Sequence, residues 1–325
     1  MKVLITGGSG FIGTNLTQAL HGQGITFKNL DIVPPKDIRL AANYSYCDLL
    51  NLDQVMKEFE LFQPTIVVHL AAQTDTDPKW RLEDYALNII GTENLIASIL
   101  ATKSVERYIH TSTQFVHQME GGPKHDEDYA PHTIYGESKV LNEKKIRSTD
   151  FKCSWTIIRP TNIWGPWHLR YPFEFWKILA EGKYLHPGKQ RVMRSYGYVG
   201  NVVHQIRQIM NLPVDQVDHQ TFYVGDRPID LFDWVNGFSI RQTGKRVVVM
   251  PRVVLYGLAL AGDLLRVAGI KFPITTSRYK SMTTDNPVDM KKTFDVLGEN
   301  RFTLEQGIEE TVSWMRVHHP SLIKQ

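Results

Sequence analysis

The chain has 325 residues, of which 42% are hydrophobic and 22% charged, the proportions of an ordinary soluble globular protein. This length suits two lobes that share a cleft. The net charge of +3, from 37 basic and 34 acidic residues, is too balanced for a nucleic-acid-binding protein recognised by charge alone. Cys47 and Cys153 show no metal-ligand spacing, so we expect a cytoplasmic protein with reduced, structural cysteines and no bound metal.

The N-terminus predicts a buried strand that runs into a glycine turn. Val3–Ile5 is a continuous apolar run, typical of a parallel strand, and its start at residue 2 leaves no room for a signal peptide. Gly7, Gly10 and Gly13 follow, and a helix is predicted from Phe11 to Gln23. In this pattern the first glycine allows a tight turn, the second lets the backbone approach a pyrophosphate, and the third lets the helix pack on the strand.

A second apolar run, residues 25–30, ends in Asp31, 18 positions beyond Gly13. That distance is close to the roughly 20-residue spacing of the carboxylate that binds the adenosine ribose hydroxyls. The stretch therefore predicts a dinucleotide site, with the phosphates at the N-terminus of the helix. We expect NAD rather than NADP, because a carboxylate here would repel a 2′-phosphate and the next arginine, Arg39, is eight residues away.

Strands continue to alternate with helices along the chain. Further strands are predicted at 44–47, 65–70, 108–111, 155–158 and 221–224, and helices at 52–60, 82–102, 135–147 and 201–210. This alternation favours right-handed crossovers and a Rossmann-like, doubly wound parallel sheet, so the fold class is α/β. We assign residues 1–165, joined by 196–225, to the dinucleotide-binding domain, and 166–325 to a smaller mixed substrate-binding lobe.

Several residues follow these strands at the edge where open α/β sheets bind ligands. Asp48 either reaches the adenine amino group or caps the helix at 52–60, and the sequence favours neither. The small residues Ala71 and Ala72 would let a cofactor lie against the backbone. Thr113 places a hydroxyl in position for a substrate.

Tyr135 and Lys139 are four residues apart and therefore share one helical face. A phenol has an ordinary pKa of about 10, and an adjacent ammonium lowers it, so that a tyrosinate can act as a base. A YxxxK pattern alone usually marks a solvated helix face. After a dinucleotide fingerprint and a threonine at a strand end, it predicts a catalytic pair.

Beyond Pro166 the alternation weakens and aromatic residues cluster, from Trp164 to Trp176. Near the C-terminus, Thr303–Gln306 predicts a capping box for a helix that runs to Val317. The apolar segment Val253–Ile270 contains Asp263 and is too short to span a membrane, which needs about 20 apolar residues. We expect a helix buried in the second lobe, with a peripheral membrane contact as the alternative.

The motifs together resemble one family, the extended short-chain dehydrogenases/reductases of the NAD-dependent nucleotide-sugar epimerase/dehydratase type. The resemblance runs nearly end to end. It rests on TGGSGFIG at 6–13, HLAA at 69–72, NIIGTEN at 88–94, TST at 111–113, YGESK at 135–139, RPTNIWGP at 159–166 and FTLEQGIEETVSWM at 302–315.

The resemblance implies a role for individual residues. NAD would contact Gly7, Gly10, Phe11, Ile12, Gly13, Asp31, Asp48, Leu49, Ala71, Ala72, Tyr135, Lys139 and Pro160. Thr113, Tyr135 and Lys139 would be catalytic, and Thr113, Asn162 and Arg194 would bind substrate. The chain departs from the family at Ser195 and Asn201, where acids are usual. Gln114–Phe115 replaces the Asp–Glu that dehydratases carry after the catalytic threonine, which makes dehydration less favoured.

The resemblance thus implies an NAD-dependent epimerase that oxidises a nucleotide-sugar hydroxyl and returns the hydride to the other face. The alternative is a net NAD-dependent dehydrogenase or reductase of a sugar or a sterol-like alcohol, because the tail around 274–285 resembles relatives that act on apolar alcohols. Helices 82–102 and 135–147 resemble those that form a four-helix interface, so a homodimer is expected. No nucleic-acid partner and no membrane span are expected.

Overall fold

The computed structural model describes residues 1–77, 79–118, 123–168, 174–267, 269–270 and 272–324. Tyr171 and Phe173 of the predicted aromatic cluster lie outside these ranges. The chain divides into two compact units. Unit 1 comprises Met1–Ile163, Val199–Gly225 and Asp289–Arg301, and unit 2 comprises Trp164–Tyr198, Asp226–Val288 and Phe302–Gln325.

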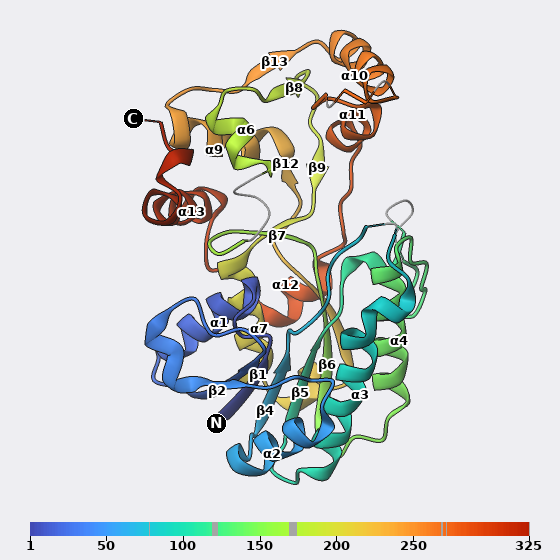
Figure 1. Cartoon of the computed structure of the whole chain (residues 1–325), viewed down its shortest axis with the longest axis vertical. Coiled ribbons are helices and arrows are strands. Elements are labelled where there is room, and N and C mark those ends of the chain that lie inside the picture. Colours follow the sequence, from blue (N-terminus) through green and yellow to red (C-terminus); the bar gives the residue numbers. More distant parts are fainter. Residues whose placement is uncertain (78, 119–122, 169–173, 268, 271, 325) are drawn as a thin grey trace. The chain divides into compact units, whose positions relative to one another are not determined.

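Unit 1 is built on a seven-stranded sheet of order β11-β6-β5-β4-β1-β2-β3, in which every neighbouring pair is parallel (Figure 1). The strands are β1 (Lys2–Thr6), β2 (Thr26–Asp31), β3 (Tyr44–Tyr46), β4 (Ile66–His69), β5 (Arg107–Thr111), β6 (Ser154–Pro160) and β11 (Gln220–Val224). The strand predicted at 221–224 does rejoin the sheet beside β6. The predicted α/β class and doubly wound parallel sheet are confirmed.

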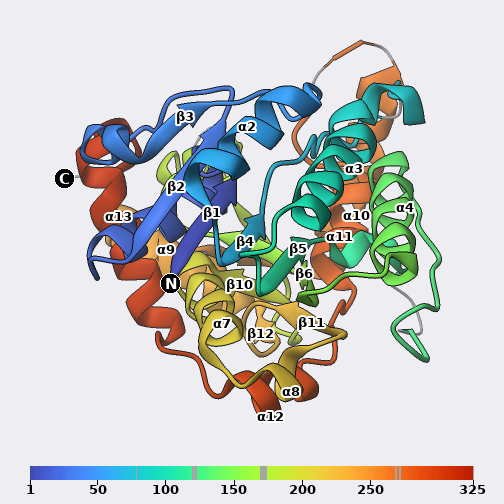
Figure 2. The ribbon, with the colours of Figure 1, turned by 90° about the horizontal axis from the view of Figure 1, so that it is seen from below.

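Helices cover both faces of this sheet, and α3 and α4 lie side by side (Figure 2). The helices of unit 1 are α1 (Phe11–His21), α2 (Leu52–Phe62), α3 (Ala86–Ala101), α4 (Ile134–Ser148), α7 (Val199–Asn211), α8 (Val214–Val217) and α12 (Lys291–Leu297), with short 3₁₀ turns η1 (Ile38–Asn43), η2 (Leu82–Tyr85) and η3 (Gln114–Val116). One core joins alternate strand residues, such as Leu4 and Val67, to Phe59 of α2 and Leu95 of α3. Because helices cover the other face of the sheet as well, both sets of alternating side chains are buried, and the strands are apolar throughout.

Residues 289–301 belong to unit 1, although they were predicted to lie in the substrate-binding lobe. They include α12, which packs on β11 and α7. Thr293 fixes this packing, because its hydroxyl donates a hydrogen bond to the Tyr223 carbonyl of β11. The short helix carries no sequence signal for such a return.

Unit 2 consists of small helices and short strands. These are α6 (Trp176–Ala180), β8 (Leu185–Pro187), β9 (Met193–Arg194), β10 (Tyr196–Tyr198), β12 (Ile229–Asp230), α9 (Leu231–Thr243), β13 (Val248–Met250), α10 (Arg252–Val267), α11 (Thr276–Thr283), α13 (Leu304–His318) and η4 (Pro320–Leu322), while β7 (Asn162–Trp164) lies at the boundary of the units. The core is aromatic, with Trp164, Trp176 and Phe238 buried. The capping box predicted for α13 is present between Thr303 and Gln306.

The apolar segment 253–270 is not the buried helix that we expected. Its described residues form most of α10, of which only Leu255, Ala259 and Gly262 are buried. Val253, Leu264 and Val267 are 84%, 74% and 89% exposed. No helix among the described residues is both long and apolar enough to cross a membrane.

Candidate active site

The glycine turn between β1 and α1 is closed on two sides by backbone. Gly7 has a positive φ of 73°, and its amide donates to the Leu30 carbonyl at 2.9 Å. A Cβ atom at Gly7 would lie 2.5 Å from the Ala71 amide nitrogen, and one at Gly13 would lie 2.1 Å from the Gly7 carbonyl oxygen. Only glycine is therefore compatible with these two positions.

The space beside Gly10 is open by comparison. Gly10 is the N-cap of α1, and no side chain caps this helix. A Cβ atom at Gly10 would meet one atom within 4 Å, the Gly7 carbonyl oxygen at 3.2 Å. The predicted contacts Phe11 and Ile12 are the first residues of α1. A helix N-terminus behind an open glycine is a suitable cradle for a pyrophosphate.

Asp31 and Ala71 lie beside this cradle. The Asp31 carboxylate, at the end of β2, accepts hydrogen bonds from the Ser9 amide at 3.0 Å and the Val33 amide at 3.1 Å. The backbone of Ala71, just after β4 and before Ala72, is what a Cβ atom at Gly7 would meet first. Because a carboxylate only accepts hydrogen bonds, Asp31 suits the hydroxyls of a ribose, and these residues fit a dinucleotide.

Of the two roles considered for Asp48, helix capping is wrong. Asn51 is the N-cap of α2, where its side chain accepts from the Gln54 amide. The Asp48 carboxylate instead accepts from the Leu50 amide at 2.9 Å. The neighbouring Leu49 carbonyl accepts from Asn94 of α3 at 2.8 Å, so this loop is held against α3.

Thr113 and Tyr135 are brought together by a hydrogen bond between their side chains. Thr113 follows β5, and Tyr135 lies in the first turn of α4. Gly136 allows this approach, because a Cβ atom there would lie 2.4 Å from the Phe115 carbonyl oxygen. Thr133 caps α4 by accepting the Gly136 amide at 3.0 Å.

The Tyr135 phenol is more basic than we expected from the sequence. Burial raises its pKa to about 12, which the hydrogen bond with Thr113 partly opposes. In the chain alone the pKa is therefore raised, not lowered as we expected. The Lys139 ammonium, 1% exposed, donates to the Thr111 carbonyl at 2.9 Å, and burial lowers its pKa to about 8.

A buried ion pair behind this cluster was missed by the sequence analysis. The Glu143 carboxylate, one turn after Lys139, lies 2.6 Å from the guanidinium of Arg159, and both side chains are fully buried. Glu143 also accepts from the hydroxyls of Ser112 and Tyr129, at 2.5 and 3.0 Å. The pair thereby joins the ends of β5 and β6 to α4. Arg159 was visible only as part of a motif, and nothing in the sequence marks its partner.

Asn88 is a second positioning residue. In the sequence it stands out only as part of the motif at 88–94. It is fully buried in α3. Its amide nitrogen donates to the Ser138 hydroxyl at 2.9 Å and to the Gln73 carbonyl at 3.0 Å, and its oxygen accepts from the Gln73 amide at 2.8 Å. Asn88 thus holds the segment after Ala72 against α4.

The predicted substrate residues fall in different units. Asn162 belongs to unit 1, where its side-chain oxygen accepts from Gln114 at 3.1 Å, and Pro160 ends β6. Gln114, which follows Thr113, is therefore a further candidate contact. Arg194 belongs to unit 2 and donates to the carbonyl and hydroxyl of Ser281. Among the described residues, its buried Nε has no hydrogen-bond partner.

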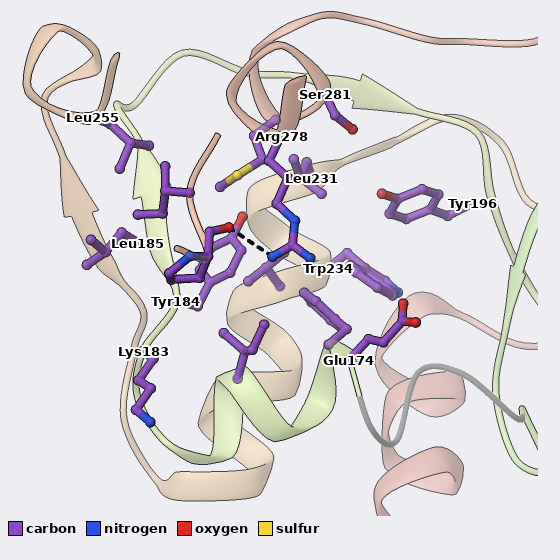
Figure 3. Close-up of a pocket in the computed structure, with 16 residues that line it drawn as sticks. Glu174, Lys183, Tyr184, Leu185, Tyr196, Leu231, Trp234, Leu255, Arg278 and Ser281 are labelled. Carbon is purple, nitrogen blue, oxygen red and sulfur yellow. Dashed lines mark hydrogen bonds between the residues drawn. The ribbon is translucent and has the colours of Figure 1, made fainter. Parts of the chain in front are cut away.

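Unit 2 contains a cavity of about 320 Å³ (Figure 3). Its walls are mainly apolar and aromatic, and include Tyr184, Trp234 and Leu255. The guanidinium of Arg278, which donates to the Pro273 carbonyl at 2.9 Å, reaches between Tyr184 and Trp234 (Figure 3). A cationic group inside an apolar wall suits a ligand with both an apolar part and an anionic part.

Comparison with known proteins gives a family match and full-length relatives. Residues 3–225 match the model of the NAD dependent epimerase/dehydratase family. The chain is 27% identical to an N-acetyl-alpha-D-glucosaminyl-diphospho-ditrans,octacis-undecaprenol 4-epimerase of Escherichia coli O157:H7, over 98% of this chain and 96% of the relative. It is 29% identical to a UDP-glucose 4-epimerase of Vibrio cholerae, over 95% and 94%. It is also 24% identical to a 3-beta-hydroxysteroid dehydrogenase of Mycolicibacterium neoaurum, over 96% and 91%.

Proposed function

The chain belongs to the NAD-dependent epimerase/dehydratase family, and from that membership we propose that it is an NAD-dependent epimerase of a nucleotide-activated sugar. One observation carries the proposal. Thr113, hydrogen-bonded to Tyr135 of α4, follows β5 at the same carboxyl edge of the parallel sheet as the glycine turn after β1. In open α/β sheets this edge binds the ligand.

The proposed NAD contacts divide by the part of the cofactor that they would hold. Gly7, Gly10 and the start of α1 would hold the pyrophosphate, and Asp31 the adenosine ribose. Asp48, Leu49, Ala71, Ala72 and Pro160 would line the remaining length, with Lys139 near the nicotinamide ribose. When bound, NAD supplies a positively charged ring that accepts a hydride from a substrate carbon and returns it.

Tyr135 is the proposed acid–base group for the substrate hydroxyl. With its pKa raised to about 12 by burial, the phenol holds its proton near neutral pH in the chain alone. To take a proton from the substrate, the tyrosinate must be stabilised by positive charge nearby, and Lys139 lies one helical turn away. Thr113, hydrogen-bonded to Tyr135, would hold the reacting oxygen in line with the phenol.

We further propose that the reacting carbon is C4 of a hexose carried on a diphosphate. Two full-length relatives are named as 4-epimerases of such sugars, one on UDP and the other on undecaprenol. Asn162 and its partner Gln114 are the proposed contacts in unit 1, and Arg194 the proposed contact in unit 2. An epimerase of this kind returns the hydride to the opposite face of the same carbon, so no cofactor is consumed.

The test uses the purified chain without added cofactor. We expect retained NAD on denaturation, and conversion of UDP-glucose or UDP-N-acetylglucosamine to its C4 epimer without net NADH. An N-acetylglucosaminyl diphosphate on a polyprenol provides the second carrier. Tyr135→Phe should retain NAD and lose conversion. Exchangeable cofactor, no epimer from any of these sugars and net NADH from an alcohol would refute the epimerase assignment.

A net NAD-dependent dehydrogenase of a sugar or sterol-like alcohol is the second candidate. The apolar cavity in unit 2 favours it, and a relative of similar length is named as a steroid dehydrogenase. The same catalytic residues would serve, with Tyr135 taking the hydroxyl proton. The assay above separates the two, because a dehydrogenase forms one NADH for each alcohol oxidised.

Asp31 is proposed to select NAD over NADP. A carboxylate at the ribose would repel a 2′-phosphate, and Arg39, the nearest arginine along the chain, is paired with Asp37 at 2.5 Å. Asp31→Ala should relax the preference by about tenfold, the effect of roughly 1.4 kcal/mol. The check is a titration of the NAD-free chain with both cofactors. Tighter binding of NADP by the wild type would contradict the assignment.

We also propose a homodimer through α3 and α4. Both helices expose apolar side chains, with Ile90 and Leu100 on α3 at 47% and 50% exposure and Leu141 on α4 at 39%. Packing between two copies would cover them. Sedimentation that gives only a 37.3 kDa species at micromolar concentration would contradict this proposal.

A further inference from the structure

The exposed face of α10 is apolar along the whole helix. At 3.6 residues per turn, eight of its nine exposed positions form one continuous arc, and the ninth, Arg266, lies on the other side of the helix. This apolar face consists of Val253, Val254, Tyr256, Gly257, Leu260, Ala261, Leu264 and Val267. Among the side chains of these eight residues, the Tyr256 hydroxyl is the one polar group. A monomeric protein rarely exposes such a contiguous surface without a partner for it.

The opposite side of α10 is firmly packed inside unit 2. Leu255 and Ala259 are fully buried, and a Cβ atom at Gly262 would lie 1.9 Å from the Ile274 carbonyl oxygen. The Asp263 carboxylate accepts from the amide and hydroxyl of Thr276 at the start of α11. The apolar face is therefore presented by an anchored helix, and its exposure does not come from fraying.

Positive charge predominates in the sequence around α10. Residues 245–280 contain seven lysines and arginines but one acid, Asp263, whereas the whole chain has a net charge of only +3. A surface hollow of about 570 Å³ at the C-terminal end of α10 is lined by Arg266 and Arg278 together with Ile270, Phe272 and Pro273. Within the part of the chain that the structure describes, no carboxylate forms an ion pair with either arginine.

We propose that unit 2 docks on an anionic lipid bilayer through the apolar face of α10, with the net positive charge of residues 245–280 attracting the lipid phosphates. An amphipathic helix with apolar residues on one face and Arg or Lys on its polar face lies in the membrane interface. The helix is about 24 Å long at 1.5 Å per residue, so it would lie along the surface. A second copy is a poorer occupant, because it would bring two strongly basic segments together.

The test is co-sedimentation of the full-length chain with vesicles of phosphatidylcholine alone or mixed with phosphatidylglycerol. We expect binding to the anionic vesicles that weakens as salt rises, and about tenfold weaker binding to phosphatidylcholine alone. Leu264→Asp with Val267→Asp should reduce binding by about tenfold or more, because charges would enter the interface. The matched control is Val317→Asp on α13, which is 75% exposed in the same unit.

Arg266→Gln tests the contribution of positive charge separately. It should weaken binding to anionic vesicles by several-fold, about the effect of one basic residue near the surface, and flatten the salt dependence. Lys103→Gln, an exposed lysine of unit 1, should do neither. Failure of the wild type to bind either vesicle, or unchanged binding by the double variant, would overturn the proposal. Dissociation of a wild-type dimer by the double variant would show instead that a second copy covers α10.

The proposal does not depend on the reaction that the enzyme catalyses. Conversion of a soluble UDP-sugar by the double variant should equal that of the wild type. Loss of vesicle binding with unchanged turnover would therefore support the docking surface whichever sugar is the substrate.

Discussion

Helices α4 and α10 are nearly equal in length, but in neither does burial follow composition. Helix α4 buries charged residues, whereas α10 exposes apolar ones. The 15-residue α4 contains six charged residues and still buries Lys139 and Glu143. The 16-residue α10 is mostly apolar and leaves Leu264 and Val267 largely exposed. In both helices these unusually placed residues are three or four positions apart, so they are neighbours on one helical face.

The two helices differ in what contacts these buried polar and exposed apolar side chains. In α4 each buried polar group has a partner inside the chain: Lys139 donates to Thr111, Glu143 is paired with Arg159, and Asn142 donates to Thr92. Among the described residues, the apolar face of α10 has no comparable cover. Internal partners mark a site preorganised for chemistry, and an uncovered apolar face marks a surface meant for another molecule.

The largest expected effect comes from removing the phenol hydroxyl of α4. Tyr135→Phe should lower turnover by roughly 10²–10⁴-fold, because a positioned proton-transfer group contributes that much. Thr113→Val should cost less, since it removes a hydrogen bond and leaves the base. The measurement is single-turnover epimerisation of a UDP-sugar with equal bound NAD in each variant. Turnover of Tyr135→Phe within a few-fold of wild type would show that another group moves the proton.

The next effect is on stability. Glu143→Ala should lower the free energy of unfolding by about 3–5 kcal/mol, because it leaves the fully buried Arg159 charge without its carboxylate. Urea unfolding measures the change, and Glu137→Ala, at an exposed position of the same helix, is the matched control. Adding Arg159→Met should recover part of the loss. A loss below about 1 kcal/mol would mean that water reaches the pair.

The sequence predicts one of these helices well and the other badly, for a physical reason. Tyr135 and Lys139 are recognisable because their spacing of four is a local property of a helix. The pairing of Glu143 with Arg159 depends on how β6 lies against α4, which no local pattern encodes. The sheet itself was predictable, because continuous apolar runs between helices have few alternatives in an α/β fold.

The prediction for α10 was wrong because an apolar segment does not specify which of its sides is covered. The sequence shows apolar residues around most of the helix, and the packing of Gly262 against Ile274 selects the buried side. A similar limit applies to Asp48 and Asn51, since both residue types cap helices and lie three positions apart.

Lys139 gives an intermediate effect on stability that depends on pH. Its folded-state pKa of about 8 lies below the ordinary 10.5, so folding disfavours the charged form below pH 8. The cost, up to about 3 kcal/mol, is relieved as pH rises from about 8 to 10.5. Lys139→Met should therefore raise the free energy of unfolding of the NAD-free chain at pH 7. The lost hydrogen bond to Thr111 should reduce this gain, and the gain should vanish towards pH 10.5.

Urea unfolding at several pH values measures this difference. Lys145→Met, at an exposed position of the same helix, is the matched control. A Lys139→Met variant that is less stable than the wild type at pH 7 would indicate that the ammonium is better paired than its burial implies.

The smallest expected effect concerns α10 and tests whether its apolar face contributes to folding at all. Leu264→Asp should change the free energy of unfolding by less than about 0.5 kcal/mol, since this side chain is 74% exposed. Leu255→Asp, on the buried side of the same helix, should cost several times more because it buries an unpaired charge. Urea unfolding of the two variants, at two protein concentrations and without lipid, gives the comparison. A large, concentration-dependent loss from Leu264→Asp would mean that the face is covered within an oligomer. A small loss would show that the apolar face contributes little to folding, so that the face stays available to bind a partner.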